Sequence, residues 1–136
     1  MKTLIKLPAL DFDNQAFWTS GRTGSLRICF CAACGRYQHP PLPVCPNCGS
    51  LDVEHRPVSG QGEVITYTVN WQPWSTGQEV PFVLAIVELV EQKGLWLMTN
   101  IVQCPVEDVH IGMPVSIGFI HREDVWLPVF KPQEEK

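Results

Sequence analysis

The sequence has no apolar run long enough to span a membrane and no excess of positive charge. A membrane-spanning helix needs about 20 consecutive apolar residues, and the opening Met1-Lys2-Thr3 does not begin a signal peptide. Helical periodicity is nearly absent after the first two dozen residues, which argues against a helix bundle. These absences predict a cytoplasmic protein that is built mostly of β-strands.

Catalytic constellations are missing as well. The chain has no serine–histidine–aspartate order and no phosphate-binding loop. Its adjacent carboxylate pairs, Glu107-Asp108 and Glu123-Asp124, project apart as solvated turn residues do. The histidines are scattered without a nucleophile beside them: His39, His55, His110 and His121. The sequence therefore predicts no catalytic residue in this chain.

Charge is distributed unevenly along the chain, whose formal net charge is −4. Residues 1–60 hold six basic and four acidic side chains, a net charge of +2, whereas residues 61–136 hold four basic and ten acidic ones, a net charge of −6. An acidic second half is a poor match for a phosphate backbone, so nucleic acid is not the expected partner.

Four cysteines carry the most specific pattern in the sequence. Cys31 and Cys34 form one C-x-x-C pair, Cys45 and Cys48 form a second, and a glycine follows each pair directly. Each such turn presents two thiolates on one side of a tight bend, which is how structural zinc sites are built. We expect one structural Zn²⁺ held by these four residues in a small ribbon, with no position open to substrate.

Two other interpretations of the paired cysteines are weaker. Disulfides suit a secreted chain, and a redox C-x-x-C needs a helix start within a βαβ unit. Proline and glycine flank both pairs here and disfavour a helix. Because four cysteines complete the site, His39 is expected at the surface. Cys29 is expected to be a buried apolar residue, and Cys104 to serve packing, since no basic neighbour activates it.

The segment Asp11–Gly21 is predicted to be a short helix, with Asp13 or Asn14 capping its start and Gly21 ending it. It carries two large aromatic side chains, Phe17 and Trp18. These form either a lid over the chain's own ribbon or a docking face for another protein, and the sequence supports both equally.

Seven strands are predicted from dense β-branched and aromatic residues between turn signals. Two of them belong to the ribbon. The other five suggest a small closed barrel of the OB type. The longer link at 105–114, between the third and fourth barrel strands, is expected to form a turn or a helical cap. The predicted division is a helical segment at 1–24, a zinc ribbon at 25–59 and an OB-fold barrel at 60–136, with a polar, frayed tail from residue 131. The strand ranges are 25–30, 51–57, 63–71, 82–89, 95–101, 115–120 and 125–130.

A long loop at 72–81 separates the first two barrel strands. Trp71, Trp74 and Phe82 supply large aromatics, and Pro81 is one of its prolines. Loops at this position of an OB-fold often bind ligands. A loop folded back over the barrel mouth is the alternative.

Several stretches together resemble one known family, the proteins that join a rubredoxin-like zinc ribbon to a C-terminal OB-fold and are associated with acyl-CoA metabolism. The resemblance runs nearly from end to end, and no metal position departs from it. Its motifs are the Phe17-Trp18 helix, the run Cys31–Arg36, Pro40–Gly49, Val58–Gly62, Val80–Leu89, Ile111–Val115 and Leu127–Phe130.

The resemblance implies a non-catalytic accessory subunit. Family members are commonly partners of thiolase-like proteins, in thiolase complexes or in aldolases that cleave steroid acyl-CoA side chains, and some relatives are paired with hydratases of the hot-dog fold. The partner would carry the catalytic residues, and this chain would complete the acyl-CoA channel and stabilise the partner. Arg22, Arg27 and Arg36 are candidates for the CoA phosphates. The candidate acyl-CoA or partner contacts are Trp71, Trp74, Pro81, Phe82, Phe17 and Trp18.

Two other functions compete with this one. A single-stranded nucleic-acid-binding module is the alternative, since zinc ribbons and OB-folds occur in such proteins and Tyr67, Trp71 and Phe82 could stack on bases. The acidic barrel half argues against it. A stand-alone acyl-CoA carrier or small enzyme is the third possibility.

Overall fold

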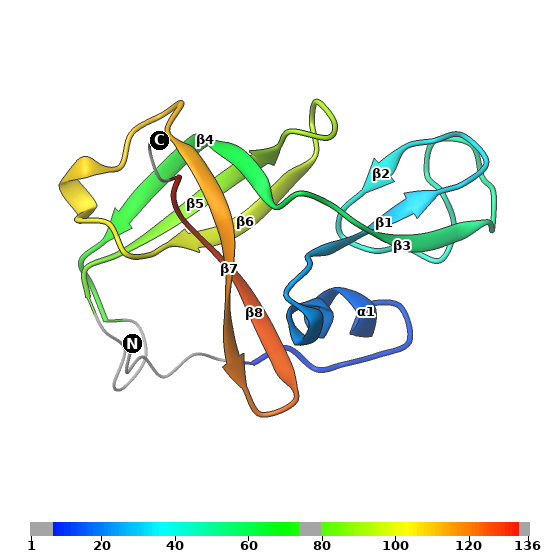
Figure 1. Ribbon diagram of the computed structural model, residues 1–136, viewed down its shortest axis with the longest axis horizontal. Helices are drawn as coiled ribbons and strands as arrows, with labels where there is room; N and C mark the ends of the chain where they lie inside the picture. The colour runs from blue at the N-terminus through cyan, green and yellow to red at the C-terminus, as the bar shows by residue number, and fades with distance from the viewer. Residues whose placement is uncertain (1–6, 74–79, 134–136) are drawn as a thin grey trace.

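The computed structural model describes residues 7–73 and 80–133 and consists of a small three-stranded sheet beside a five-stranded barrel. Figure 1 shows the sheet at one end of the molecule and the barrel at the other, with the helical turns lying between them along one side. The chain is mostly β, as predicted. Among the described residues no helix is long and apolar enough to cross a membrane.

The small sheet forms the ribbon, in the antiparallel order β2-β1-β3. Its central strand β1 (Arg27–Cys31) pairs along its whole length with β3 (Val53–Pro57). Both strands lie within two residues of their predicted positions. The two-residue strand β2 (Tyr37–Gln38) was not predicted, because so short a strand has no hydrophobic alternation to reveal it.

The barrel strands pair in the order β4-β5-β6-β8-β7, and all five correspond to predicted strands. The longer link between β6 and β7 holds a single 3₁₀ turn, η2 (Val106–Asp108), which confirms the predicted helical cap. The barrel strands are β4 (Gln61–Asn70), β5 (Phe82–Leu89), β6 (Trp96–Ile101), β7 (Pro114–Arg122) and β8 (Val125–Pro132).

The barrel core is made by the alternate residues that face inward. On β5, Val83, Ala85, Val87 and Leu89 are all at most 2% exposed, as the period of two in a strand requires. Phe130 of β8 is fully buried and packs in the same cluster. This core fixes the strands whose outer faces and edges form the groove described below.

The barrel closes at one point only between β6 and β8. The single pairing there is parallel and joins Ile101 to Phe130. The residues that precede this pair in β6 and β8 do not continue the pairing. Pro128 contributes to this, because proline has no N–H to donate to a neighbouring strand. A seam is therefore left in the barrel wall beside Trp96–Met98, whereas at Thr99 the two strands are joined by a hydrogen bond from Thr99 Oγ1 to Pro128 O (3.0 Å).

The helical segment is shorter than predicted. The α-helix α1 covers only Gln15–Trp18, and a 3₁₀ turn, η1 (Ser20–Thr23), follows it. Asn14 precedes α1 without a side-chain cap, and the helical region ends at Gly24, which has a left-handed φ of 75°, and not at Gly21. The predicted end was wrong because Gly21 serves close packing: a Cβ there would collide with Trp126 and Phe119.

Two side chains of the β5–β6 hairpin fasten the barrel to the ribbon. Gln92 Oε1 accepts a hydrogen bond from Tyr37 N (2.8 Å), and Gln92 Nε2 donates to Tyr37 O (3.0 Å). Glu91 accepts from the backbone N–H of Ser59 (2.8 Å) at the junction between the two parts. Helix α1 also contacts β1 on one side and β8 on the other, so the ribbon and the barrel are joined on two sides.

Candidate metal centre and adjoining groove

The two C-x-x-C turns have the same local geometry. In the first, Gly35 N donates to Cys31 O (2.8 Å), and in the second Gly49 N donates to Cys45 O (2.8 Å). Both glycines have left-handed φ values, 76° and 77°. Glycine adopts this conformation without strain, which explains why it follows each pair and how the backbone curls around the sulfur atoms.

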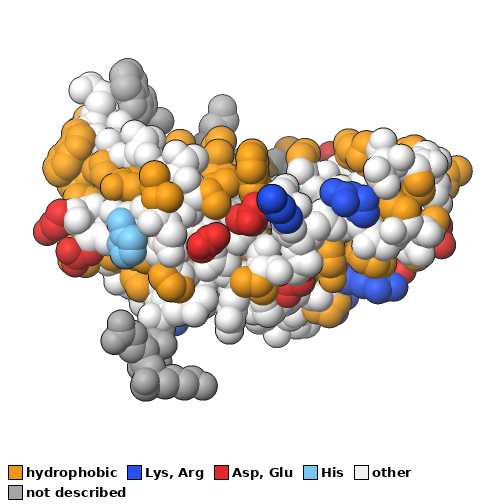
Figure 2. Space-filling model, turned by 90° about the horizontal axis from the view of Figure 1, so that it is seen from above, with side chains coloured by type: hydrophobic (Ala, Val, Ile, Leu, Met, Phe, Trp, Pro, Cys, Tyr) orange, Lys and Arg blue, Asp and Glu red, His pale blue; other side chains and the backbone are white. Residues whose placement is uncertain are grey.

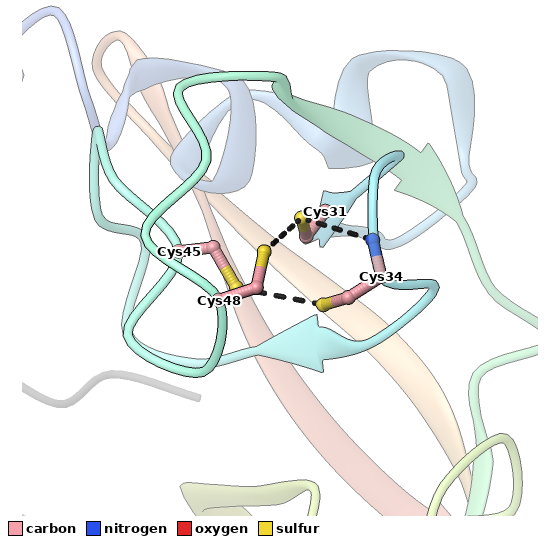
Figure 3. Close-up of side chains that lie close together, drawn as sticks. All are labelled: Cys31, Cys34, Cys45 and Cys48. Atoms are coloured by element: carbon pink, nitrogen blue, oxygen red, sulfur yellow. Dashed lines mark hydrogen bonds between the residues drawn. The ribbon is translucent and has the colours of Figure 1, made fainter.

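The four thiols converge on one point, as Figure 3 shows. Sulfur atoms of opposite turns approach to 3.6 Å, from Cys31 to Cys48 and from Cys34 to Cys45, and all four lie within 4.8 Å of one another. Ligands of a tetrahedral zinc ion with bonds of about 2.3 Å lie about 3.8 Å apart. The donor set and its spacing therefore fit a tetrahedral thiolate site, whereas a disulfide needs about 2.05 Å.

Backbone and side-chain donors lie against the sulfur atoms, and the four thiols influence one another. Although the Ser50 N–H lowers it, the Cys31 thiol and burial raise the pKa of Cys48 to about 12. The N–H of Cys48 lowers the pKa of Cys45 to about 6, the largest effect on that thiol. Cys34 N donates to Cys31 Sγ (3.4 Å), and Asn47 Nδ2 donates to Cys34 Sγ (3.6 Å). Since the thiolate is the metal ligand, these contacts prepare the turns to bind a cation.

The other two cysteines are packing residues. Cys29 is 1% exposed and accepts a hydrogen bond from Gln38 Nε2 (3.2 Å), as expected for a buried thiol. Cys104 packs against the barrel core. Burial, followed by the nearby Asp108 and Glu107 charges, raises the pKa of its thiol. A raised pKa disfavours a nucleophile.

A groove of about 660 Å³ lies where the seam between β6 and β8 meets the helical turn. Its walls are the edge of β6 (Trp96–Asn100) on one side and Leu127–Val129 of β8 on the other. Phe17, Trp18, His39 and Pro40 close it from the side of the helix and the ribbon arm. None of its lining residues carries a formal charge, so the groove suits an apolar or neutral occupant.

His39 is half-buried in this groove, and the expectation of a surface histidine was wrong. Its ring packs 4.7 Å from that of Phe17, centroid to centroid, and its Nδ1 is shielded from solvent without a hydrogen-bond partner. Burial lowers the pKa of His39 to about 4. The ring is thus neutral at pH 7. The arm between the two cysteine pairs carries His39 here, which ties the groove wall to the metal centre.

The predicted aromatic contacts fall in different environments. Phe17 is buried in the core, as a lid residue would be, while Trp18 is half-buried at the groove. Trp71 is 67% exposed and Phe82 half-buried at the start of β5, with Pro81 exposed beside it. Trp74 lies outside the described residues. The structure therefore brings Phe17 and Trp18 into the groove but none of the described loop residues.

An apolar patch on the outer face of β5 and β6 was missed by sequence reasoning. Leu84, Trp96 and Met98 also line the groove and are 38%, 51% and 71% exposed, and a smaller hollow of about 190 Å³ follows Leu84 and Met98 towards β4. The signal was present, because large apolar residues occupy both alternations of β6. A strand with one solvated face shows apolar residues on one alternation only.

Comparisons with known proteins agree with this architecture. Residues 18–54 match the family model described as the ChsH2 rubredoxin-like zinc ribbon domain, and residues 55–119 match the ChsH2 C-terminal OB-fold domain. Among solved structures, one described as "Ltp2-ChsH2(DUF35) aldolase" is similar with a TM-score of 0.81 and 41% identity, covering 93% of this chain and 98% of that chain.

Two curated relatives are longer than this chain. A probable enoyl-CoA hydratase alpha subunit of Thermomonospora curvata is 39% identical over 98% of this chain and 43% of that protein. A 3-oxo-4,17-pregnadiene-20-carboxyl-CoA hydratase alpha subunit of Mycobacterium tuberculosis is 33% identical over 93% of this chain and 40% of that protein. The chain thus spans less than half the length of each. Its zinc-ribbon and OB-fold parts, taken together, place it in the ChsH2 (DUF35) family.

Proposed function

We propose that this chain is a non-catalytic subunit of a thiolase-superfamily enzyme that acts on acyl-CoA, where it completes the acyl-CoA channel and stabilises its partner. The observation that carries the proposal is the similarity to the chain of the Ltp2-ChsH2(DUF35) aldolase, which spans nearly all of both chains. The names of the two hydratase alpha subunits also support a subunit role in acyl-CoA chemistry. An aldolase or thiolase complex, including one that degrades steroid side chains, is the specific form proposed.

The side chains support a division of labour between two subunits. Within the part of the chain that the structure describes, the only group of three or more cysteine, histidine and acidic side chains close enough to hold a metal is the cysteine cluster, whose four ligands leave no open position. Cys104 has a raised pKa, and the one half-buried histidine of the groove has Phe17 as its aromatic neighbour and no carboxylate partner. Catalytic acids, bases and nucleophiles would come from the partner.

The metal in this proposal is zinc, bound by Cys31, Cys34, Cys45 and Cys48. When bound, it would tie the two turns together and supply folding free energy to a ribbon whose own core is small. The chain's own contribution is the set of N–H donors around the sulfur atoms and the arm that carries His39 to the groove.

Charges on the surface are consistent with an acyl-CoA entering from the ribbon side. Arg22, Arg27 and Arg36 are all exposed, and Figure 2 shows blue side chains gathered on the ribbon half of the face it presents. Arginine recognises phosphate well. The apolar groove and the patch on β5 and β6 would face the acyl or pantetheine part and the partner.

Co-expression with a thiolase-like protein encoded next to this chain tests the function. We expect a heteromer on a sizing column and cleavage or transfer of an acyl-CoA that neither protein carries out alone. A partner that is fully active alone and forms no complex would overturn the proposal.

A further inference from the structure

The groove is bordered by an unpaired strand edge, and this edge identifies the kind of molecule that fits. In an antiparallel pair, successive residues point their N–H and C=O groups alternately towards and away from the partner strand. Leu89 N donates to Leu95 O across the β5–β6 pair, so Leu97, Thr99 and Ile101 also point towards β5. Trp96, Met98 and Asn100 point their backbone groups the other way, into the seam.

The opposite strand does not satisfy this edge. Beyond the Ile101–Phe130 pair and the bond from Val102 N to Phe130 O (2.8 Å), no strand pairing joins β6 to β8 within residues 80–133. Pro128 has no N–H, and its carbonyl already accepts from Thr99 Oγ1 (3.0 Å). Among residues 7–73 and 80–133, no strand therefore lies opposite the backbone groups of Trp96 and Met98.

Unpaired edges are normally protected by lysine, proline or a bulge. β6 has none of these: its sequence from Trp96 to Ile101 contains no charged residue and no proline, and its pairing with β5 runs without a register shift. Its outward side chains Trp96 and Met98 are large and exposed. The one acidic neighbour on β5, Glu88, is engaged by Trp96 Nε1 (2.9 Å) and Gly94 N (3.0 Å).

We propose that the seam between β6 and β8 is a strand-addition site, which takes an extended, uncharged peptide segment of a partner protein along the edge Trp96–Met98. Its backbone amides would pair with Trp96 and Met98. Its alternate side chains would enter the groove against Trp18 and His39, or cover the apolar patch outside. Strand addition takes its affinity from main-chain hydrogen bonds and its specificity from pockets for alternate side chains.

The uncharged lining decides the class of occupant. The three residues Trp96–Met98 extend for about 10 Å, and along this stretch the lining of the seam offers no cation to an anionic ligand. His39 is neutral at pH 7, because burial lowers its pKa to about 4. A neutral segment with apolar side chains matches these surroundings. The inference deepens the proposed function by naming the segment a partner would offer, and it rests on that function only for the partner's identity.

The test uses the complete, metal-loaded chain and a capped seven-residue peptide of alternating valine and threonine. In ¹⁵N-labelled protein, we expect saturable amide shifts centred on Trp96 and Met98. The control peptide is methylated on two adjacent central backbone nitrogens, which point to opposite edges of the extended peptide. Whichever edge faces β6 has then lost a main-chain donor, so this peptide should bind at least about tenfold more weakly.

A pair of variants tests the edge itself. Met98→Pro removes an N–H that points into the seam and breaks no bond to β5, as proline at an edge position does. It should weaken peptide binding at least about tenfold more than Met98→Ala does, because the alanine variant loses only the side-chain contact and keeps the N–H. Thermal denaturation of both variants verifies that the fold persists; if Met98→Pro does not fold, the methylated peptide still decides.

Three results would overturn the inference: no shifts at millimolar peptide, equal binding of the methylated peptide, or shifts at this edge with pantetheine but not with the peptide. No partner is needed, so the outcome is separate from that of the co-expression test. Peptide binding without any heteromer would leave the seam established and the proposed function overturned.

Discussion

The four cysteine side chains decide which metal ion the ribbon can bind. Thiolate sets of this spacing accept zinc or iron, and the closed geometry favours a structural role. We expect metal analysis of the purified chain to give one zinc per molecule. Stoichiometric iron, with its visible absorption, would contradict the assignment.

Replacing Cys31 by serine should abolish stoichiometric metal binding and unfold the ribbon, because the metal supplies folding free energy. Cys29→Ser is the matched control. It lies two residues away on the same strand, is equally buried and is outside the cluster. It should keep the metal and lose only packing. The two variants are compared by metal content and by thermal denaturation.

Protonation of His39 links the stability of the fold to pH. Its pKa is lowered from 6.5 to about 4 by burial, so the unfolded chain binds a proton that the folded chain does not between these values. The free energy of unfolding is therefore fully retained above pH 6.5 and falls as the pH decreases towards 4. From pH 7.5 to pH 5 the loss from this one group is about 2 kcal/mol.

The measurement is urea denaturation of the metal-loaded chain across that range, compared with His39→Phe. Phenylalanine keeps an aromatic ring beside Phe17 but cannot titrate, so the difference between the two unfolding curves isolates the histidine from other titrating groups. The free energy of unfolding of the wild-type chain, measured relative to that of His39→Phe, should fall as the pH decreases from 7.5 to 5. An equal pH dependence would show that His39 contributes no proton linkage.

At the scale of the elements, one glycine position controls how the barrel strands meet. Gly62 of β4 is buried and pairs with Leu89 of β5 and with Val115 of β7. A Cβ at Gly62 would collide with the Glu88 carbonyl oxygen, which is backbone and cannot swing away. We expect Gly62→Ala to destabilise the chain by about 2–3 kcal/mol, as overpacking does.

Gly118→Ala is the matched control. Gly118 also lies in a barrel strand, β7, but a Cβ there meets Val129 only at ordinary contact distance (3.8 Å). This variant should change the unfolding free energy by less than about 0.5 kcal/mol. Denaturant titration compares the two, and similar losses would show that β4 does not depend on the close approach of β5.

Much of the element pattern could be predicted from the sequence, since the barrel strands are dense in β-branched and aromatic residues and are bounded by turn residues. What could not be predicted depends on packing between distant segments. Gly21 resembles a helix stop locally but lies against Trp126 and Phe119. His39 resembles a surface residue until the arm folds it against Phe17. The cysteine cluster was predictable because its chemistry is local, whereas the seam required the pairing of β6 and β8 to be known.

The whole molecule joins a net-positive half to a net-negative half, and the junction forms its groove. Single-strand nucleic-acid binders line their groove with positive charge. This groove is uncharged, and the residues from 61 onward carry a net charge of −6. The charge distribution therefore favours a protein or acyl-CoA partner over nucleic acid. The ribbon does more than stabilise the chain, because its arm, which carries His39 and Pro40, forms one wall of the groove.

Removal of the metal tests how far the ribbon and the barrel depend on each other. The ribbon contributes few buried apolar side chains, Leu26 and Ile28, and these join the core cluster of the barrel, whose closed sheet supplies most of that cluster. Chelation should therefore expose the tryptic site at Arg36, next to β2, and leave the site at Arg122 on β7 protected. We expect cleavage at Arg36 to accelerate at least about tenfold, since local opening follows local stability.

Mass spectrometry of timed trypsin digests measures both sites in the same sample, so Arg122 serves as the internal control, and added zinc should restore protection at Arg36. Preferential cleavage at Arg36 would support the predicted boundary between residues 59 and 60. Gln92 and Glu91 fasten the two parts together by only three hydrogen bonds, and α1 packs on both. If Arg36 and Arg122 are instead cleaved at equal rates without metal, these contacts make the ribbon and the barrel a single cooperative unit, in which loss of the metal would dissolve the groove and the seam together.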